Sequence, residues 1–113
     1  MDKNTIKLVD KKGEEKKITA KNILIAVGGR PNYLNLPNAK ELCYTSDDIF
    51  WSKKEFGKTL VVGGGYIAME CAGFLNNFGK KVTILYRSKI LKKFDQDIVE
   101  KLVDFMKEQK ITF

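Results

Sequence analysis

The chain has 113 residues, of which 43% are apolar and 31% charged, so it is expected to be a soluble globular protein and not a disordered one. It contains no histidine, which excludes a histidine metal site and a Ser-His or Cys-His nucleophile pair, and Cys43 and Cys71 lack metal-knuckle or CxxC spacing. The net charge is +7, and +6 of it lies in residues 80–93 without any acidic residue, which predicts one small region suited to anions.

The first residues predict a hairpin followed by a core strand. Residues 6–10 and 16–20 read as two short strands joined by a polar turn through Gly13. The apolar run Ile23–Val27, which ends at Gly28-Gly29-Arg30-Pro31, is typical of a strand covered on both faces. From Asn32 to Phe56 the periodicity fades, which predicts a surface connection with one short helical turn.

The second half predicts alternating strands and helices. Residues 59–62 read as a buried strand that runs into three glycines, and residues 82–86 read as a second buried strand. The helix between them is expected to end at Gly79 and to bury Ile67, Cys71, Phe74, Leu75 and Phe78.

A second helix is expected to begin at the capping residue Asp95 and to reach Gln109. Its apolar residues at helical spacing are Ile98, Leu102, Phe105 and Met106, and residues 111–113 begin a third strand. The order of elements predicts right-handed crossovers and a parallel sheet, the first half of a doubly wound, Rossmann-like α/β fold. Because such a sheet normally needs further strands and cover, we expect a truncated fold, a piece of a larger protein.

The glycines after the first parallel strand match a phosphate-binding turn. Gly63, Gly65 and Ala68 form G-x-G-x-x-A between a strand and a helix. This motif needs a flexible tight bend, a bare position where a pyrophosphate approaches, and a small residue where helix meets strand. A glycine triple alone is often only a flexible turn, but this context predicts that the helix start faces two phosphates.

The residues after the second parallel strand favour NADPH over NADH. An Asp or Glu at that place would bind both hydroxyls of an adenosine ribose, whereas this chain has Tyr86 followed by Arg87. Arg87, Lys89, Lys92 and Lys93 are instead suited to the 2′-phosphate of NADPH. The simpler alternative is a solvated basic loop.

Residues 57–113, and more loosely the chain from Ile6, resemble the FAD-dependent pyridine-nucleotide disulfide reductases. Four segments carry the resemblance: Gly57–Gly63, Tyr66–Leu75, Arg87-Ser88 and Phe94–Asp97. The last two are similar to the high-molecular-weight thioredoxin reductase branch, and glutathione reductase shares much of the rest.

The resemblance implies that residues 1–31 are a remnant of an FAD-binding domain, that residues 32–56 connect, and that residues 57–113 begin the NADPH-binding domain. It implies that Gly28 lies near FAD, although Val27 stands where many relatives have threonine. It also implies an enzyme that takes hydride from NADPH, passes electrons through FAD to thioredoxin, and works as a homodimer. The family's CxxxxC redox pair and C-terminal His-Glu pair are absent here, so we expect this chain alone to be inactive, with no catalytic residue and no metal.

The same resemblance implies roles for individual residues. Tyr66 matches an aromatic ring that covers the flavin until nicotinamide displaces it, and Glu70 matches a carboxylate that holds the nicotinamide carboxamide. Arg87 and Ser88 match binders of the 2′-phosphate, and Lys92 stands where relatives commonly have a second arginine. The predicted cofactor-binding residues are therefore Gly28, Gly63, Gly64, Gly65, Tyr66, Ile67, Ala68, Glu70, Arg87, Ser88 and Lys92.

Each of these residues also has a structural interpretation. An aromatic side chain after a glycine turn often only packs, and an acid early in a helix often only complements the dipole. Cys71 is expected to be a small core residue, and Cys43 has no assigned role.

Three other interpretations of the whole chain remain: glutathione reductase, an NADH-linked relative of dihydrolipoamide dehydrogenase, or a small basic module that binds nucleic acid. We expect no nucleic-acid partner and no membrane partner. Because the polar N-terminus does not resemble a secretory signal, we expect a cytoplasmic protein.

Overall fold

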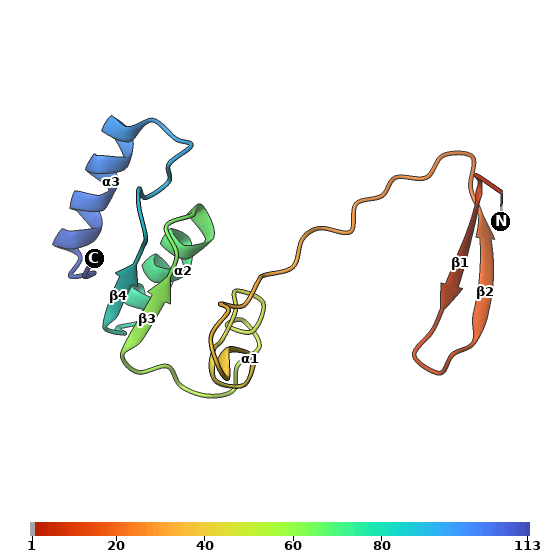
Figure 1. The fold of residues 1–113 in the computed structure, drawn as a ribbon, viewed down its shortest axis with the longest axis horizontal. Helices are drawn as coiled ribbons and strands as arrows, with labels where there is room; N and C mark the ends of the chain where they lie inside the picture. Colours follow the sequence, from red (N-terminus) through yellow and green to blue (C-terminus); the bar gives the residue numbers. More distant parts are fainter. Residues whose placement is uncertain (1) are drawn as a thin grey trace. The chain divides into compact units, whose positions relative to one another are not determined.

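The computed structural model describes residues 2–113, which divide into two compact units, one ending at Arg30 and the other beginning at Pro31. The first unit contains an antiparallel hairpin of strands β1 (Thr5–Val9) and β2 (Glu15–Thr19), shown in Figure 1. At its turn the Asp10 carboxylate accepts hydrogen bonds from the amides of residues 12 and 14, at 2.8 and 2.9 Å. The predicted hairpin is therefore confirmed.

The prediction of a core strand at Ile23–Val27 is wrong for this structure. The segment forms neither helix nor strand, and Leu24, Ile25 and Val27 are 89%, 82% and 89% exposed. Among the described residues, no strand pairs with it. An apolar run becomes a core strand only where neighbours accept its backbone hydrogen bonds and cover its side chains, and this unit provides neither.

The second unit contains one helical turn and then two strands alternating with two helices. Helix α1 (Ala39–Leu42) is the turn expected in the connection, and it is followed by β3 (Thr59–Val62), α2 (Tyr66–Asn77), β4 (Val82–Leu85) and α3 (Gln96–Glu108). Strands β3 and β4 are parallel (Figure 1). These elements confirm the predicted order almost to the residue.

The segment predicted as a third strand forms one isolated parallel bridge beside β4. Thr112 forms a parallel bridge with Thr83, and the amide of Ile84 donates to the carbonyl of Thr112 at 2.7 Å. Strand β4 therefore lies between β3 and residue 112, which is the neighbour order of the first half of a doubly wound sheet.

The predicted capping residues lie at the end of α2 and at the start of α3. At the end of α2, Gly79 has a φ of 76°, and the amide of Lys80 donates to the carbonyl of Leu75 at 3.1 Å. This is a Schellman motif, which needs a left-handed residue and therefore favours glycine. At the start of α3, the Asp95 carboxylate accepts hydrogen bonds from the amides of residues 97 and 98, at 3.0 and 3.2 Å.

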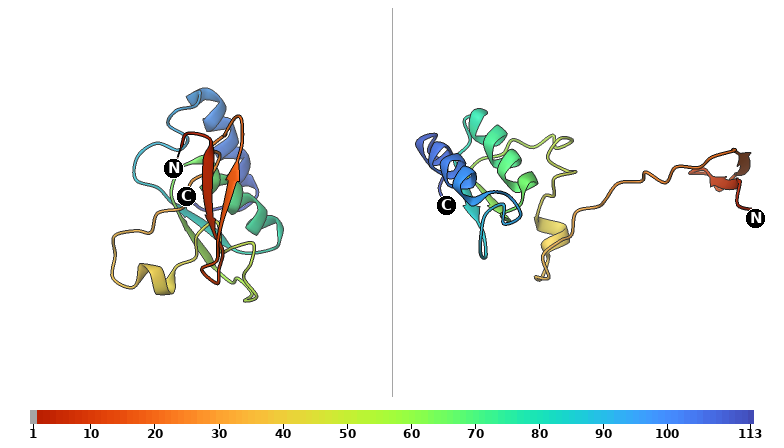
Figure 2. Two further views of the ribbon diagram at one scale, coloured as in Figure 1. Left: turned by 90° about the vertical axis from the view of Figure 1, so that its right-hand side faces the viewer. Right: turned by 90° about the horizontal axis from the view of Figure 1, so that it is seen from above.

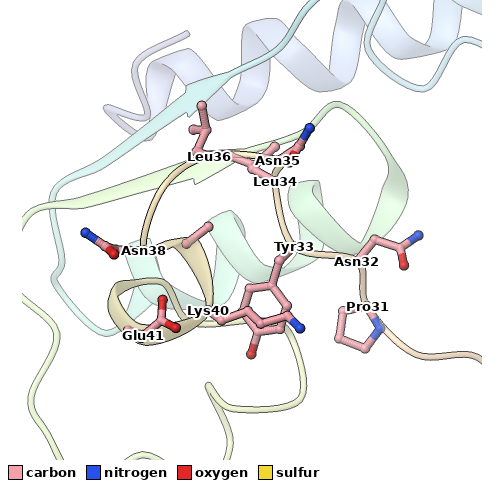
Figure 3. Close-up of a pocket in the computed structure, with 10 residues that line it drawn as sticks. Pro31, Asn32, Tyr33, Leu34, Asn35, Leu36, Asn38, Lys40 and Glu41 are labelled. Carbon is pink, nitrogen blue, oxygen red and sulfur yellow. The ribbon is translucent and has the colours of Figure 1, made fainter.

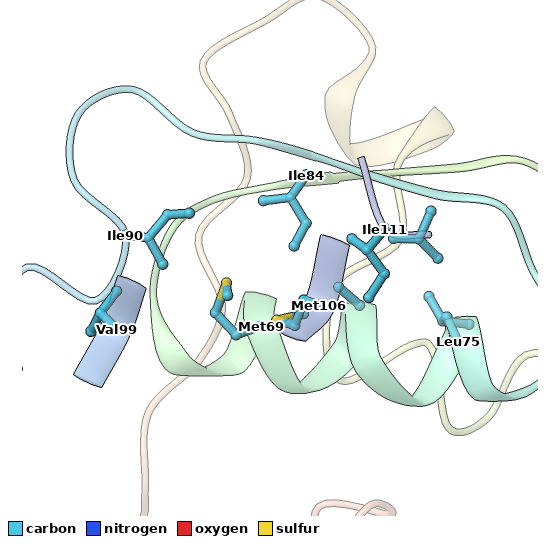
Figure 4. Packing of buried hydrophobic residues seen from close by; sticks show 9 residues of the cluster. Met69, Leu75, Ile84, Ile90, Val99, Met106 and Ile111 are labelled. Carbon is cyan, nitrogen blue, oxygen red and sulfur yellow. The ribbon is translucent and has the colours of Figure 1, made fainter. Parts of the chain in front are cut away.

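One hydrophobic core joins the sheet to both helices (Figure 4). Helix α2, helix α3 and strand β4 all contribute buried side chains, so both helices cover the same face of the sheet (Figure 2). The core consists of Met69, Ala72, Leu75, Val82, Ile84, Ile90, Val99, Met106 and Ile111. Ile84 is only 1% exposed.

The predicted apolar faces of the two helices are partly wrong. Ile67 and Phe78 of α2 are 45% and 75% exposed, and Ile98 and Phe105 of α3 are 68% and 58% exposed. Leu102 of α3 is 37% exposed as well, whereas the predicted burial of Leu75 and Met106 is confirmed. Each helix has more than one apolar stripe, and periodicity shows that a helix forms without showing which stripe meets the sheet.

The strands β3 and β4 were predicted to be buried, but only one face of each strand is covered. On the opposite face Leu60, Val62 and Leu85 are 57%, 47% and 55% exposed. We refer to these three residues as the bare sheet face. Within residues 2–113, no helix has the length and apolar character needed to cross a membrane.

Candidate nucleotide-binding site

The glycine turn joins β3 to α2 in a conformation that favours glycine. Gly63 has a φ of 142°, and its amide donates to the carbonyl of Leu85 at 2.9 Å, which ties the turn to β4. A Cβ placed on Gly63 would lie 3.5 Å from the Cβ of Ala68, so the first helical turn packs closely against the bend. A Cβ placed on Gly65 would meet nothing within 4 Å. The backbone at Gly65 is therefore open to a ligand.

The start of α2 leaves its amides for an external acceptor. Gly65 is the N-cap residue and has no side chain that could cap the helix. The amides of Tyr66, Ile67 and Ala68 have no acceptor within the helix, as at every helix start. The first turn contains no acidic residue, so nothing there opposes an anion at the positive end of the helix dipole. This geometry can hold a phosphate group.

The loop after β4 packs against the glycine turn. We call residues 86–94 the basic loop. The amide of Leu91 donates to the carbonyl of Gly64 at 2.7 Å, and a Cβ placed on Gly64 would lie 3.3 Å from the Cβ of Tyr86. Ile90 is buried in the core. The two parts of the predicted site, separated by about twenty residues in the sequence, are therefore adjacent in the fold.

The polar side chains of the basic loop point into solvent. Arg87, Ser88, Lys89, Lys92 and Lys93 are all exposed. Among the described residues none of them has a hydrogen-bond or ion-pair partner for its side chain. Their charge is therefore available to an anion that lies beside the glycine turn.

Tyr66 and Glu70 lie on one face of α2, because they are four positions apart. Tyr66 is the first residue of the helix and is 58% exposed, and Glu70 is exposed as well. Burial and, secondarily, the charge of Glu70 raise the pKa of the Cys71 thiol. Cys71 is half-buried, not a full core residue, and Cys43 is exposed.

Gly28 belongs to the first unit. Its φ of 69° is the left-handed conformation that glycine adopts most easily. Its position near FAD stays a prediction.

The six positive residues of 80–93 do not form a single region, which corrects the expectation from the sequence. Lys80 and Lys81 precede β4, whereas the other four follow it, and a four-residue strand is roughly 13 Å long. The Lys80 Nζ also pairs with the Glu55 carboxylate at 2.6 Å, which lowers the pKa of Glu55. Only the four residues of the basic loop lie near the glycine turn.

Two concave regions of the second unit lie away from the glycine turn. A cavity of about 750 Å³ is lined by residues of the segment 31–41, including Tyr33 and Asn38 (Figure 3). A second cavity of about 730 Å³ lies at the opposite end of β3 and β4, beside Lys58, Lys81 and Lys110. Neither includes the three glycines, so neither cavity is the predicted phosphate-binding site.

Sequence reasoning did not find Leu91. Its φ is 45°, which is unusual for a branched apolar residue, and its contact with Gly64 runs through the backbone. Because no side-chain pattern announces such a contact, only the fold reveals it.

Comparison with protein families gives a match over residues 1–113 to the family described as pyridine nucleotide-disulphide oxidoreductase. The chain is 47% identical over 113 residues to thioredoxin reductase SEP1 of Emiliania huxleyi, which covers 100% of this chain and 23% of that protein. It is 45% identical over 113 residues to mitochondrial thioredoxin reductase 2 of Drosophila melanogaster, covering 99% and 22%. It is 49% identical over 115 residues to a thioredoxin reductase of Plasmodium falciparum, covering 99% and 21%. The chain thus spans about a fifth of the length of these relatives.

Proposed function

This chain belongs to the pyridine nucleotide-disulphide oxidoreductase family, and from that premise we propose that it is the NADPH-binding part of a thioredoxin reductase-type enzyme. One observation carries the choice of NADPH. The hydrogen bond from Leu91 to Gly64 holds a loop with four cations, and with no carboxylate directly after β4, against the glycine turn. A ligand on that turn would meet positive charge where an NADH site has an acid.

The residues present fit the phosphates of NADPH. The open backbone at Gly65 and the free amides of Tyr66 and Ile67 would hold the pyrophosphate. The Arg87 guanidinium would bind the 2′-phosphate with two parallel hydrogen bonds, and the Ser88 hydroxyl would donate a third.

Lys92 would add charge to the same phosphate without the geometry of an arginine. Its ammonium group is exposed on the basic loop and is a flexible point charge. It would therefore strengthen the preference for the doubly charged phosphate but contribute less to orientation.

The exposed face of α2 that carries Tyr66 and Glu70 would contact the nicotinamide ring of NADPH. Glu70 would accept a hydrogen bond from the carboxamide NH₂ group and so orient the ring. The Tyr66 ring would shield the reaction face from water until the nicotinamide takes its place. Bound NADPH supplies the hydride, and the residues of this chain bind and orient it.

The segments of this chain would belong to different domains of the intact enzyme. We propose that residues 1–31 belong to an FAD-binding domain with Gly28 near the flavin, that residues 32–56 connect the domains, and that residues 57–113 open the NADPH-binding domain. The intact enzyme would reduce thioredoxin as a cytoplasmic homodimer. This chain alone would bind nucleotide without turning over.

Titration of the complete chain with NADPH and with NADH, followed by the fluorescence of the reduced nicotinamide, tests the proposal. We expect NADPH to bind at least about tenfold more tightly, because the 2′-phosphate adds charge-assisted hydrogen bonds. Equal affinities would contradict it. A labelled single-stranded oligonucleotide serves as the control, and salt-sensitive binding that NADPH does not displace would favour a nucleic-acid module.

A further inference from the structure

We propose that Leu91 is a positioning residue whose backbone bond to Gly64 sets the preference of the site for the 2′-phosphate. This inference rests on the proposed function and assigns a role to a residue that contributes no charge. The bond is short, at 2.7 Å, and it joins the middle of the basic loop to the middle of the glycine turn. It therefore fixes the distance between the two parts of the site.

The conformation of Leu91 is held from several sides. Its φ of 45° is disfavoured for a leucine and persists only where the surroundings determine it. Its carbonyl accepts from the amide of Phe94 at 2.8 Å and from the Gln96 Nε2 at 3.3 Å. Its side chain packs against the core, and the preceding Ile90 is buried. Leu91 and the neighbouring Ile90 thus anchor a loop whose charged side chains are exposed.

The anchor decides where the positive charges lie. Lys92 and Lys93 are the two central residues of the turn closed by the bond between Phe94 and Leu91. Arg87 and Ser88 precede the anchor, and none of these side chains has a partner of its own among the described residues. Their placement consequently depends on the backbone, and a released backbone would spread them over many positions. The amides that hold the pyrophosphate lie on α2 and would stay in place.

Gly64 is the other partner in this contact and differs from its neighbour Gly65. A Cβ on Gly64 would lie 3.3 Å from the Tyr86 Cβ and 3.4 Å from the Lys89 carbonyl oxygen, so the basic loop would have to shift by a few tenths of an ångström. A Cβ on Gly65 would meet no protein atom within 4 Å. It would instead occupy the space for the pyrophosphate, which both nucleotides share.

Four variants of the complete chain separate these effects. Leu91→Pro removes the leucine side chain, the amide donor and the possibility of a positive φ. Leu91→Gly also removes the leucine side chain, but it keeps the amide donor and permits a positive φ. We expect Leu91→Pro to lower the ratio of NADPH to NADH affinity about tenfold, through lost phosphate contacts, and Leu91→Gly to lower it much less. Gly64→Ala should lower the ratio in the same direction. Gly65→Ala should weaken the binding of both nucleotides and leave the ratio of NADPH to NADH affinity near that of the unchanged chain.

An unchanged ratio in both Leu91→Pro and Gly64→Ala would overturn the proposal, provided the unchanged chain prefers NADPH. If the unchanged chain shows no preference, the proposed function fails first, and this inference with it. Amide hydrogen exchange of the unchanged chain gives a readout that does not depend on any variant folding. We expect the Leu91 amide to be protected, and exchange at the rate of an unstructured peptide would show that the anchor is absent.

Discussion

Replacing Arg87 by alanine tests the proposal that its guanidinium recognises the 2′-phosphate of NADPH. Arg87 is exposed and has no hydrogen-bond or ion-pair partner among the described residues, so its removal should leave the free energy of unfolding unchanged within about 0.5 kcal/mol. A guanidinium bound to a phosphate contributes about 1.5–3 kcal/mol, which corresponds to a roughly 10- to 150-fold larger dissociation constant for NADPH. The NADH affinity should not change, because that nucleotide lacks the 2′-phosphate.

Two further variants sharpen this test. Arg87→Lys keeps the charge but loses the paired hydrogen bonds, so its NADPH affinity should fall between those of the other two chains. As a control, Lys101→Ala removes an equal charge from α3 and should leave the affinities for NADPH and NADH unchanged. Isothermal titration calorimetry at low and high salt would measure the dissociation constants of both nucleotides for the unchanged chain and for the three variants. If Arg87→Ala binds NADPH within about threefold of the unchanged chain, the guanidinium does not hold the phosphate.

Three predictions concern stability. Ile84→Ala, at a side chain 1% exposed, should lower the free energy of unfolding in urea by about 2–5 kcal/mol, whereas Leu24→Ala, at a side chain 89% exposed, should change it little; equal losses would contradict the core assignment. Asp95→Ala removes the cap of α3 and should cost about 1 kcal/mol in the same assay, and an unchanged midpoint would argue against the cap. The Thr45 hydroxyl and the Thr45 amide both donate to the Asp48 carboxylate. These two hydrogen bonds, the hydroxyl more than the amide, lower the pKa of that carboxyl below its ordinary 3.8. Because the folded state favours the carboxylate, this contribution is present above the ordinary value and is lost as the pH falls through the lowered one. Asp48→Asn should therefore reduce the melting temperature at about pH 6, and this reduction should shrink as the pH is lowered below the ordinary pKa; a reduction that does not change with pH would refute the assignment.

The sequence predicted the elements of the second unit well because their signals are local. The strand before the glycines, the Asp95 cap and the left-handed Gly79 each depend on a few neighbouring residues. The glycine motif likewise needs only its own spacing and the elements beside it.

The errors have a common physical cause, which is dependence on partners distant in the sequence. The apolar run Ile23–Val27 has the composition of a core strand, but among residues 2–30 no strand pairs with it. The exposed Ile67 and the buried Met69 both belong to apolar stripes of α2, and only the position of the sheet decides between them. The Leu91 anchor joins two backbones and leaves no trace in side-chain chemistry.

The bare sheet face has a practical consequence for every experiment above. Leu60, Val62 and Leu85 expose apolar side chains to water, and exposed apolar patches promote self-association as the protein concentration rises. Light scattering should therefore show particle size growing with protein concentration. Replacing Leu60 by lysine should reduce this growth without changing any residue that is proposed to bind the nucleotide.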